Sequence, residues 1–275
     1  MTALTTDQTT FYQQNGYLAP IEIFTEDEAR SLYVTFQQLE KDYGEVLQGY
    51  GRNNSHQVLP LFDQIAHHPR ILDVIESLIG PNILVAGTTL FVKEPEQRGF
   101  ISWHQDALYN GLRPCNWTTA WLALTDVTTE NGCMYMWPES HLLGQRSHVD
   151  TFGDDNLLTR GQTVMNVPED EIVPIELRSG QLSVHHPWVV HGSGHNTSNK
   201  RRVGLAIQSY IGTEVEQILG KTFVQLARGR DDYNHHYLVQ RASGVMVDEE
   251  VVTWHDANRA LRKVLYHDAE KLGKY

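Results

Sequence analysis

Apolar residues at three- and four-residue spacing dominate the first 81 residues of the chain. The clearest stretch opens with the capping box Thr25-Glu-Asp-Glu28 and stops at Gly44. The same pattern predicts helices over residues 7–16 and from Pro69 to Gly80. We therefore expect residues 1–81 to form a helical N-terminal part, which packs most simply against the outside of a sheet.

From Asn82 onward the pattern changes to short runs rich in β-branched and aromatic residues, separated by turn residues. Such runs are typical of strands. Several of them in succession predict two sheets packed as a jelly roll of the cupin kind, in a mainly β fold with flanking helices. The expected strands cover residues 83–86, 88–93, 118–126, 134–137, 172–177, 181–185 and 202–211.

Alternation along residues 202–211 predicts what each face of this strand contacts. One face is small or polar, from Arg202 and Gly204 to Gln208 and Tyr210, and suits a cavity wall. The other face is apolar and suits packing under helices. This alternation favours Arg202 over its neighbour Arg201 as the arginine of the cavity.

Two further segments complete the expected organisation. Residues 141–171 show no clear strand or helix, and a loop of this length is usually a lid, a binding loop or disordered. Beyond Gly212, helices are expected over residues 214–228 and near residues 256–270. We expect one domain over residues 1–275, with a jelly-roll core at 82–212 and a C-terminal helical extension at 213–275. We predict that residues 141–171 form a polar lid over a substrate, because they include Arg146, His148, Asp150, Asp154, Asp155 and Arg160.

Composition narrows the functional classes. The formal net charge of −12 argues against nonspecific nucleic-acid binding, which needs clustered Lys and Arg. No apolar run is long enough to span a bilayer, so we expect no membrane partner. Cys115 and Cys133, the two cysteines, fit free thiols of a reducing compartment. A cytoplasmic protein with a small-molecule substrate is the expectation.

The run Ile101–Leu108 contains His-x-Asp, with His104 and Asp106 two residues apart. Alternate side chains of a strand point to one face, so the imidazole and the carboxylate can hold adjacent positions on one metal ion. A distant second histidine would complete a 2-His-1-carboxylate triad, which typically binds Fe(II). Taken alone, the motif is more often a solvated strand end.

Residues 185–210 supply further parts of such a site. His191 precedes a Gly-Ser-Gly turn that contains Ser193, and Arg202 follows 11 positions after His191. Three other histidines lie near His191, and they are expected to line the pocket or lie beyond the turn: His185, His186 and His195.

These segments, with the block from Asn131 to His141, resemble the phytanoyl-CoA dioxygenase family of Fe(II)/2-oxoglutarate oxygenases. Glu139 stands where the family has glycine, which puts the local turn in question. The resemblance implies a double-stranded β-helix fold, with His104, Asp106 and His191 as iron ligands.

The resemblance also implies how the cosubstrate is held. Ser193 and Arg202 would bind the far carboxylate of 2-oxoglutarate, since a guanidinium matches a carboxylate with two parallel hydrogen bonds. Trp121 is interpreted as a core residue, with a role in lining the cosubstrate pocket as the alternative. Lys93 is interpreted as exposed, with a pocket role as the alternative.

The implied reaction consumes O₂ and 2-oxoglutarate, releases succinate and CO₂, and hydroxylates an unactivated C–H bond. Related halogenases carry Ala or Gly at the position of Asp106, so an acid there favours hydroxylation. Desaturation, cyclisation or epimerisation with the same cofactors stays open, as does a noncatalytic or other-metal cupin-like binding protein.

The substrate is expected to be a small polar metabolite, because the chain shows no basic surface for coenzyme A. Bacterial members of the family act on amino acids, phosphonates or specialised-metabolite alkaloids, so an alkaloid or amino-acid-like compound is favoured. The candidate substrate residues are Gln105, Tyr109, Asn110, Arg113 and His148.

Overall fold

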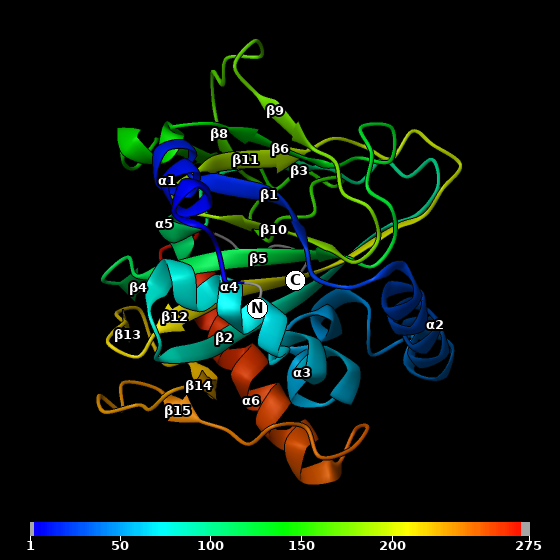
Figure 1. The fold of residues 1–275 in the computed structure, drawn as a ribbon, viewed down its shortest axis with the longest axis vertical. Helices are drawn as coiled ribbons and strands as arrows, with labels where there is room; N and C mark the ends of the chain where they lie inside the picture. Colours follow the sequence, from blue (N-terminus) through cyan, green and yellow to red (C-terminus); the bar gives the residue numbers. More distant parts are fainter. Residues whose placement is uncertain (1–2, 271–275) are drawn as a thin grey trace.

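Two mainly antiparallel sheets form the centre of the computed structural model, which describes residues 3–270 (Figure 1). The major sheet has the strand order β1-β10-β5-β12-β2-β14-β15, and the minor sheet has the order β3-β11-β6-β9. This is the predicted mainly β jelly-roll architecture with flanking helices. The major-sheet strands are β1 (Tyr17–Glu22), β2 (Ile83–Lys93), β5 (Trp117–Ala123), β10 (Gln181–His185), β12 (Arg202–Gly212), β14 (Phe223–Arg228) and β15 (Tyr237–Leu238). The minor-sheet strands are β3 (Ile101–His104), β6 (Met134–Trp137), β9 (Val173–Ile175) and β11 (Val190–Ser193).

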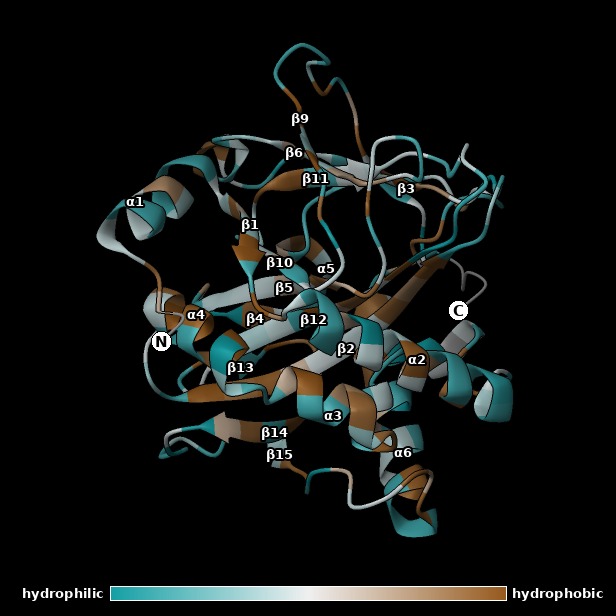
Figure 2. Ribbon diagram, turned by 45° about the vertical axis from the view of Figure 1, so that its right-hand side comes forward, coloured by the Kyte–Doolittle hydropathy of each residue, from teal (hydrophilic) through white to brown (hydrophobic). Residues whose placement is uncertain are grey.

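The N-terminal helices flank the major sheet, and those between Pro60 and Ile79 lie over its outer face (Figures 1 and 2). The N-terminal helices are α1 (Thr6–Asn15), α2 (Glu26–Tyr43), α3 (Pro60–Ala66) and α4 (Pro69–Ile79), with short 3-10 turns η1 (Gly49–Arg52) and η2 (Ser55–Gln57). Fully buried apolar residues such as Phe36 and Phe62 pack there against Val203, Leu205 and Ile207 of β12. The helices predicted from residues 7, 25 and 69 are confirmed, whereas α3 was not predicted.

The C-terminal segment departs from its prediction. Residues 214–228 form no helix; they contain β13 (Glu216–Gln217), which pairs with β4 (Leu112–Arg113), and β14, which pairs with β2. Pairing with the exposed edge of β2 outweighs the helical propensity of this segment. The last helix, α6 (Asp248–Leu265), begins eight residues before the expected start near residue 256 and ends at Leu265.

A bulge in β12 corrects the predicted alternation of that strand. Its register shifts between Ala206 and Ser209 against β2, and between Ile207 and Tyr210 against β5. Beyond a bulge the side chains change face. Arg202 and Gln208 therefore line the cavity as predicted, but Tyr210 lies in the helix-covered core, where its hydroxyl donates to the Ala66 carbonyl oxygen (2.7 Å).

Residues 141–171 are more ordered than predicted. They include most of η3 (Ser140–Leu143) and the paired strands β7 (His148–Asp150) and β8 (Gln162–Val164). The Arg160 guanidinium pairs with the Asp150 carboxylate, and the side chains that reach the cavity are those of Leu157, Leu158, Thr159 and Gln162. The wall that this segment contributes is therefore half apolar, with two leucines and two polar residues.

None of the helices within residues 3–270 combines the length and the apolar character needed to cross a membrane. Cys115 and Cys133 are both free thiols.

Candidate metal centre and adjoining cavity

His104 and His191 are directly opposite each other on neighbouring strands β3 and β11 of the minor sheet. Asp106 follows β3 at the start of the short helix α5 (Ala107–Asn110). The ligand atoms of these three residues all lie within 4.8 Å of one another. The structure thus brings together the two distant histidines and the carboxylate that the sequence pattern singled out, and a helix start, instead of a continued strand, supplies the acid.

Main-chain hydrogen bonds orient both imidazoles. Nδ1 of His104 lies 2.9 Å from the Ser102 carbonyl oxygen, and Nδ1 of His191 lies 3.1 Å from that of Val189. Each Nδ1 therefore carries the proton, so that Nε2 presents a lone pair toward Asp106. This is the tautomer that a metal ligand requires.

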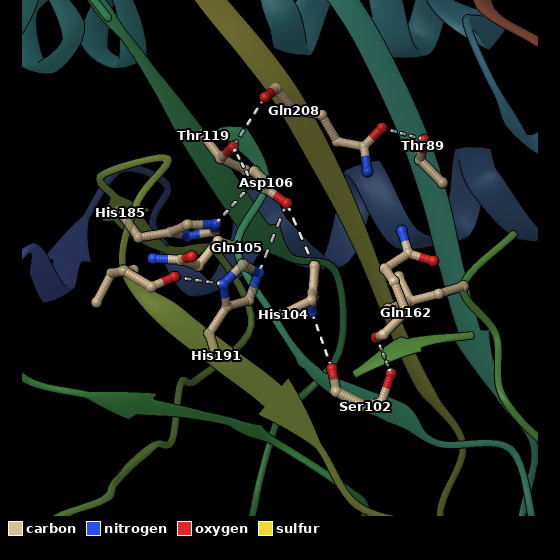
Figure 3. A network of polar contacts seen from close by, with 12 residues as sticks. Thr89, Ser102, His104, Gln105, Asp106, Thr119, Gln162, His185, His191 and Gln208 are labelled. Carbon is tan, nitrogen blue, oxygen red and sulfur yellow. Dashed lines mark hydrogen bonds and ion pairs between the residues drawn. The ribbon is translucent and has the colours of Figure 1, made fainter. Parts of the chain in front are cut away.

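The two oxygens of the Asp106 carboxylate have different neighbours (Figure 3). Oδ1 lies 3.4 Å from Nε2 of His104 and 3.8 Å from Nε2 of His191. Oδ2 accepts from the Thr119 hydroxyl at 2.8 Å and lies 3.3 Å from Nε2 of His185. The sequence predicted His185 only as a residue of the pocket lining, and it gave no signal for Thr119.

The protonation states of the side chains in this cluster suit the binding of a metal cation. Burial opposes ionisation of Asp106, but the neighbouring His191, His104 and His185 together hold its pKa well below the usual range. Burial lowers the pKa of His191 well below its ordinary value, and repulsion from His104 and His185 acts in the same direction. The site is therefore a carboxylate beside neutral imidazole, which is the protonation state of metal-binding side chains.

A second charged group lies at the other end of the same cavity. Arg202 of β12 and Lys93 of β2 are cross-strand neighbours, and both are 1% exposed. Nε and Nη1 of Arg202 have no hydrogen-bond partner within the described part of the chain. No carboxylate of residues 3–270 forms an ion pair with either cation. A buried guanidinium without an anionic partner, beside a buried amine, forms a site for an anionic ligand.

Lys93 is buried, so its interpretation as an exposed lysine is wrong. Its Nζ lies 2.8 Å from the Ser193 hydroxyl and also contacts the carbonyl oxygens of Gly132 and Gly194. Burial, followed by the neighbouring Arg202, lowers the pKa of Lys93 to about 6. The sequence did not show that Arg202 would pair opposite Lys93.

Trp121 lies beneath this anion site. The Arg202 guanidinium carbon is 4.7 Å from the centroid of the indole ring, a cation–π arrangement. Gly204 makes the space, because a Cβ at this position would lie 1.9 Å from the nearest ring carbon. Trp121 is 2% exposed and lines the cavity, so it has both the core position and the pocket position that the sequence left open.

The remaining predicted substrate residues are placed unevenly. Tyr109 and Asn110 line the cavity, whereas Arg113 and His148 lie outside its lining. Arg113 on β4 stacks over the Trp188 ring at 5.6 Å. His148 accepts from the Gln105 main-chain N–H at 3.1 Å.

Gln105 also lines the cavity, but its side-chain amide is hydrogen-bonded to main-chain groups. Nε2 donates to the carbonyl oxygens of Gly144 and Trp188, at 3.0 and 2.7 Å. Oε1 accepts from the N–H of Arg146 at 2.7 Å. Gln105 therefore anchors the loop after η3, and its amide has no N–H left to donate to a ligand.

The block from Asn131 to His141 keeps its turn despite the glutamate. Glu139 adopts φ 64°, ψ −7°, the left-handed conformation in which glycine is common. The departure at Glu139 therefore leaves the local turn intact.

Comparison with known sequences agrees with this geometry. The sequence model of the phytanoyl-CoA dioxygenase (PhyH) family matches residues 12–204. The chain belongs to the phytanoyl-CoA dioxygenase family. This is a family of Fe(II)- and 2-oxoglutarate-dependent oxygenases, and two imidazoles with one carboxylate are the donor set that suits Fe(II).

Individual relatives are distant. The rat protein "Phytanoyl-CoA dioxygenase, peroxisomal" is 26% identical over 229 residues, which cover 74% of this chain and 67% of the rat protein. Other curated relatives are matched over about half of their length. Membership therefore establishes the class of enzyme, whereas activity and substrate are not transferred from these relatives.

Several solved structures share the fold of this chain. The non-heme monooxygenase ThoJ is 29% identical with a TM-score of 0.84, covering 94% of this chain and 97% of ThoJ. CytC3 with Fe(II) and α-ketoglutarate is 21% identical with a TM-score of 0.69, covering 89% of this chain and 96% of CytC3. A carbocyclase and an epimerase from nogalamycin biosynthesis share the fold too.

Proposed function

We propose that this enzyme is a Fe(II)/2-oxoglutarate-dependent dioxygenase that hydroxylates a C–H bond of a small polar metabolite. The observation that carries the cosubstrate assignment is Arg202. Its guanidinium is buried in the wall of the cavity that contains His104, Asp106 and His191, and two of its nitrogen atoms have no partner among the described residues. The far carboxylate of 2-oxoglutarate would supply that partner.

Each residue has a defined task in this proposal. His104, Asp106 and His191 hold Fe(II), which when bound supplies the O₂-dependent oxidation of a C–H bond. Arg202 and Ser193 of the cavity wall bind the far carboxylate of 2-oxoglutarate, and Lys93 lies behind them with its Nζ 2.8 Å from the Ser193 hydroxyl. Because these groups lie in a largely buried site, their electrostatic attraction is stronger than it would be in water.

Trp121 shapes the floor of the cosubstrate pocket in this proposal. Its indole ring supports the Arg202 guanidinium from below, so that the guanidinium edge is directed at the ligand. The arginine is thereby held in place before the cosubstrate binds, which reduces the conformational entropy lost on binding.

The rest of the cavity supports a small polar substrate. The cavity encloses about 980 Å³, its open mouth included, a size that suits a small molecule. On the side of Asp106 away from His185 lie the side chains of Thr89, Gln208 and Gln162 (Figure 3). Four leucines also line the cavity: Leu157, Leu158, Leu261 and Leu265.

This lining favours a compact molecule with hydrogen-bonding groups and an apolar portion. An alkaloid or amino-acid-like compound meets this description, and we propose no nucleic-acid or membrane partner. Tyr109 and Asn110 remain candidates for substrate contact, whereas Arg113 and His148 lie outside the cavity lining. The cytoplasmic location stays a prediction.

Hydroxylation is proposed over chlorination because Asp106 retains the acidic ligand, and desaturation, cyclisation and epimerisation with the same cofactors are the alternatives. The outcome depends on where the substrate radical lies relative to the metal. Product analysis by mass spectrometry with ¹⁸O₂ separates these outcomes, since hydroxylation alone adds one labelled oxygen to the substrate. A product without labelled oxygen would replace hydroxylation with one of the alternatives.

The deciding experiment is anaerobic addition of Fe(II) and 2-oxoglutarate to metal-free protein. A visible charge-transfer band of the chelate is expected in wild type and should weaken strongly in Arg202→Ala. Arg201→Ala is the matched control, because Arg201 pairs with Glu40 and Glu94 outside the cavity. Bound metal without a band would refute the proposal in favour of another metal or a binding protein.

A further inference from the structure

His185 is a fourth histidine beside the metal centre, and neither metal binding nor cosubstrate binding accounts for it. It lies on β10 directly opposite Thr119 of β5, so both side chains point to the same face of the major sheet. Both contact the same atom, Oδ2 of Asp106. A cross-strand pair therefore holds the carboxylate oxygen that faces away from His104 and His191.

Proton counting shows that Thr119 alone cannot hold this oxygen. Its hydroxyl lies 2.8 Å from Oδ2 of Asp106 and 2.8 Å from the carbonyl oxygen of Gln208, and both are acceptors. A hydroxyl has one proton, so it satisfies only one of them at a time. When Gln208 receives that proton, the N–H of His185 is the donor left for the ionised Asp106.

The environment of His185 argues against a purely space-filling role. The residue is 1% exposed, and its Nδ1 has no hydrogen-bond partner within residues 3–270. Among the described residues, the His185 side chain forms one hydrogen bond, from Nε2 to Asp106, and its ring lies 4.5 Å from that of His191. A phenylalanine would occupy a similar volume without an unpaired buried nitrogen, so packing alone does not explain a histidine here.

We propose that His185 is a positioning residue that donates to Oδ2 of Asp106, so that the carboxylate offers the metal Oδ1 alone. Binding through one oxygen keeps a coordination position open for the cosubstrate chelate. Without His185, Oδ2 has no donor when the Thr119 proton goes to Gln208, and the carboxylate is no longer fixed with Oδ1 toward the metal site. The inference rests on the proposed metal centre and deepens it.

Co(II) titration of the metal-free protein tests this without 2-oxoglutarate or turnover. His185→Phe keeps the ring and removes the donor, and it should weaken Co(II) binding about ten- to a hundredfold. His185→Gln keeps an N–H donor and should recover most of the affinity. His255→Phe is the matched control, because His255 is exposed on α6. The free energy of unfolding, measured for metal-free protein in the presence of a chelator, should be the same for His185→Phe as for wild type. This result separates a positioning role from a structural one.

A second measurement uses the wild type itself, in case His185→Phe does not fold. The infrared difference between Co(II)-loaded and metal-free protein reports the carboxylate stretches of Asp106. A wide separation of the two stretches is expected, since this marks coordination through one oxygen. A narrow separation, or Co(II) affinity in His185→Phe within twofold of wild type, would overturn the proposal.

The two proposals fail in different ways. A wild type that binds Co(II) but forms no 2-oxoglutarate band with Fe(II) would refute the proposed function and leave the His185 result valid. A wild type that binds no Co(II) would refute the metal centre, and the role of His185 with it.

Discussion

Replacing Lys93 with methionine should change how the stability of the ligand-free enzyme depends on pH. Burial and the neighbouring Arg202 lower the pKa of Lys93 to about 6, whereas an unfolded lysine titrates near ~10.4. Between these values the unfolded chain binds one more proton than the folded chain. The free energy of unfolding therefore rises with pH, by about 1.4 kcal/mol per unit from this residue alone.

The structure gives the size of the effect. Between pH ~6.5 and ~8.5, titration of Lys93 should add about 2.5 kcal/mol to the unfolding free energy of wild type relative to Lys93→Met. The Lys93 Nζ contacts the carbonyl oxygens of Gly132 and Gly194 and the Ser193 hydroxyl, so the amine is hydrogen-bonded without a charged partner. Other groups titrate equally in both proteins, so the difference between them isolates the lysine.

Urea unfolding at several pH values, without metal or cosubstrate, measures this difference. Lys200→Met serves as the control, because Lys200 is exposed and should unfold in parallel with wild type at every pH. Parallel pH profiles for wild type and Lys93→Met would refute the reasoning, since they would mean that the buried Lys93 is already charged at neutral pH.

The same titration should appear in cosubstrate binding. An arriving carboxylate favours the charged form of Lys93, so 2-oxoglutarate binding near pH 8 should take up close to one proton. Affinity should therefore fall by up to about tenfold per pH unit above the free pKa. Calorimetry in buffers of different ionisation enthalpy measures this uptake, which should be absent in Lys93→Met.

Three further predictions follow from particular contacts. Asp106→Ala should reduce metal affinity and substrate oxidation by about a hundredfold or more, measured by Co(II) titration and succinate formation; wild-type rates would refute its role as a ligand. Gly204→Ala should displace the Trp121 ring, lower stability by about 1–3 kcal/mol and weaken 2-oxoglutarate binding, whereas unchanged thermal unfolding would contradict the observed close approach. Arg160→Met should break the pair with Asp150 and increase hydrogen exchange within residues 151–161 about tenfold; unchanged exchange would show that this pair does not hold the segment.

The sequence predicted local features of the fold well. Capping residues defined the start of α2, and Pro69 with Gly80 bounded α4. The motif around His104, Asp106 and His191 identified three side chains that converge in space. These signals are readable because each depends on residues near in sequence or on a strongly constrained motif.

Features that depend on strand pairing were not predicted. The segment that forms β14 has helical propensity, and only the available edge of β2 makes it a strand. The burial of Lys93 requires knowing that Arg202 lies opposite it, and the task of His185 requires knowing its partner Thr119. The bulge that turns Tyr210 into the core likewise leaves no simple mark on the alternation.

The division of the metal centre between two sheets has a consequence for the lifetime of the protein. His104 and His191 belong to the minor sheet, whereas Asp106 is gripped by Thr119 and His185 of the major sheet. A bound ion would therefore cross-link the two sheets, and its binding energy would add to the energy needed to separate them. Iron supply would then set resistance to proteolysis as well as catalytic capacity, and molecules made without iron would be degraded first.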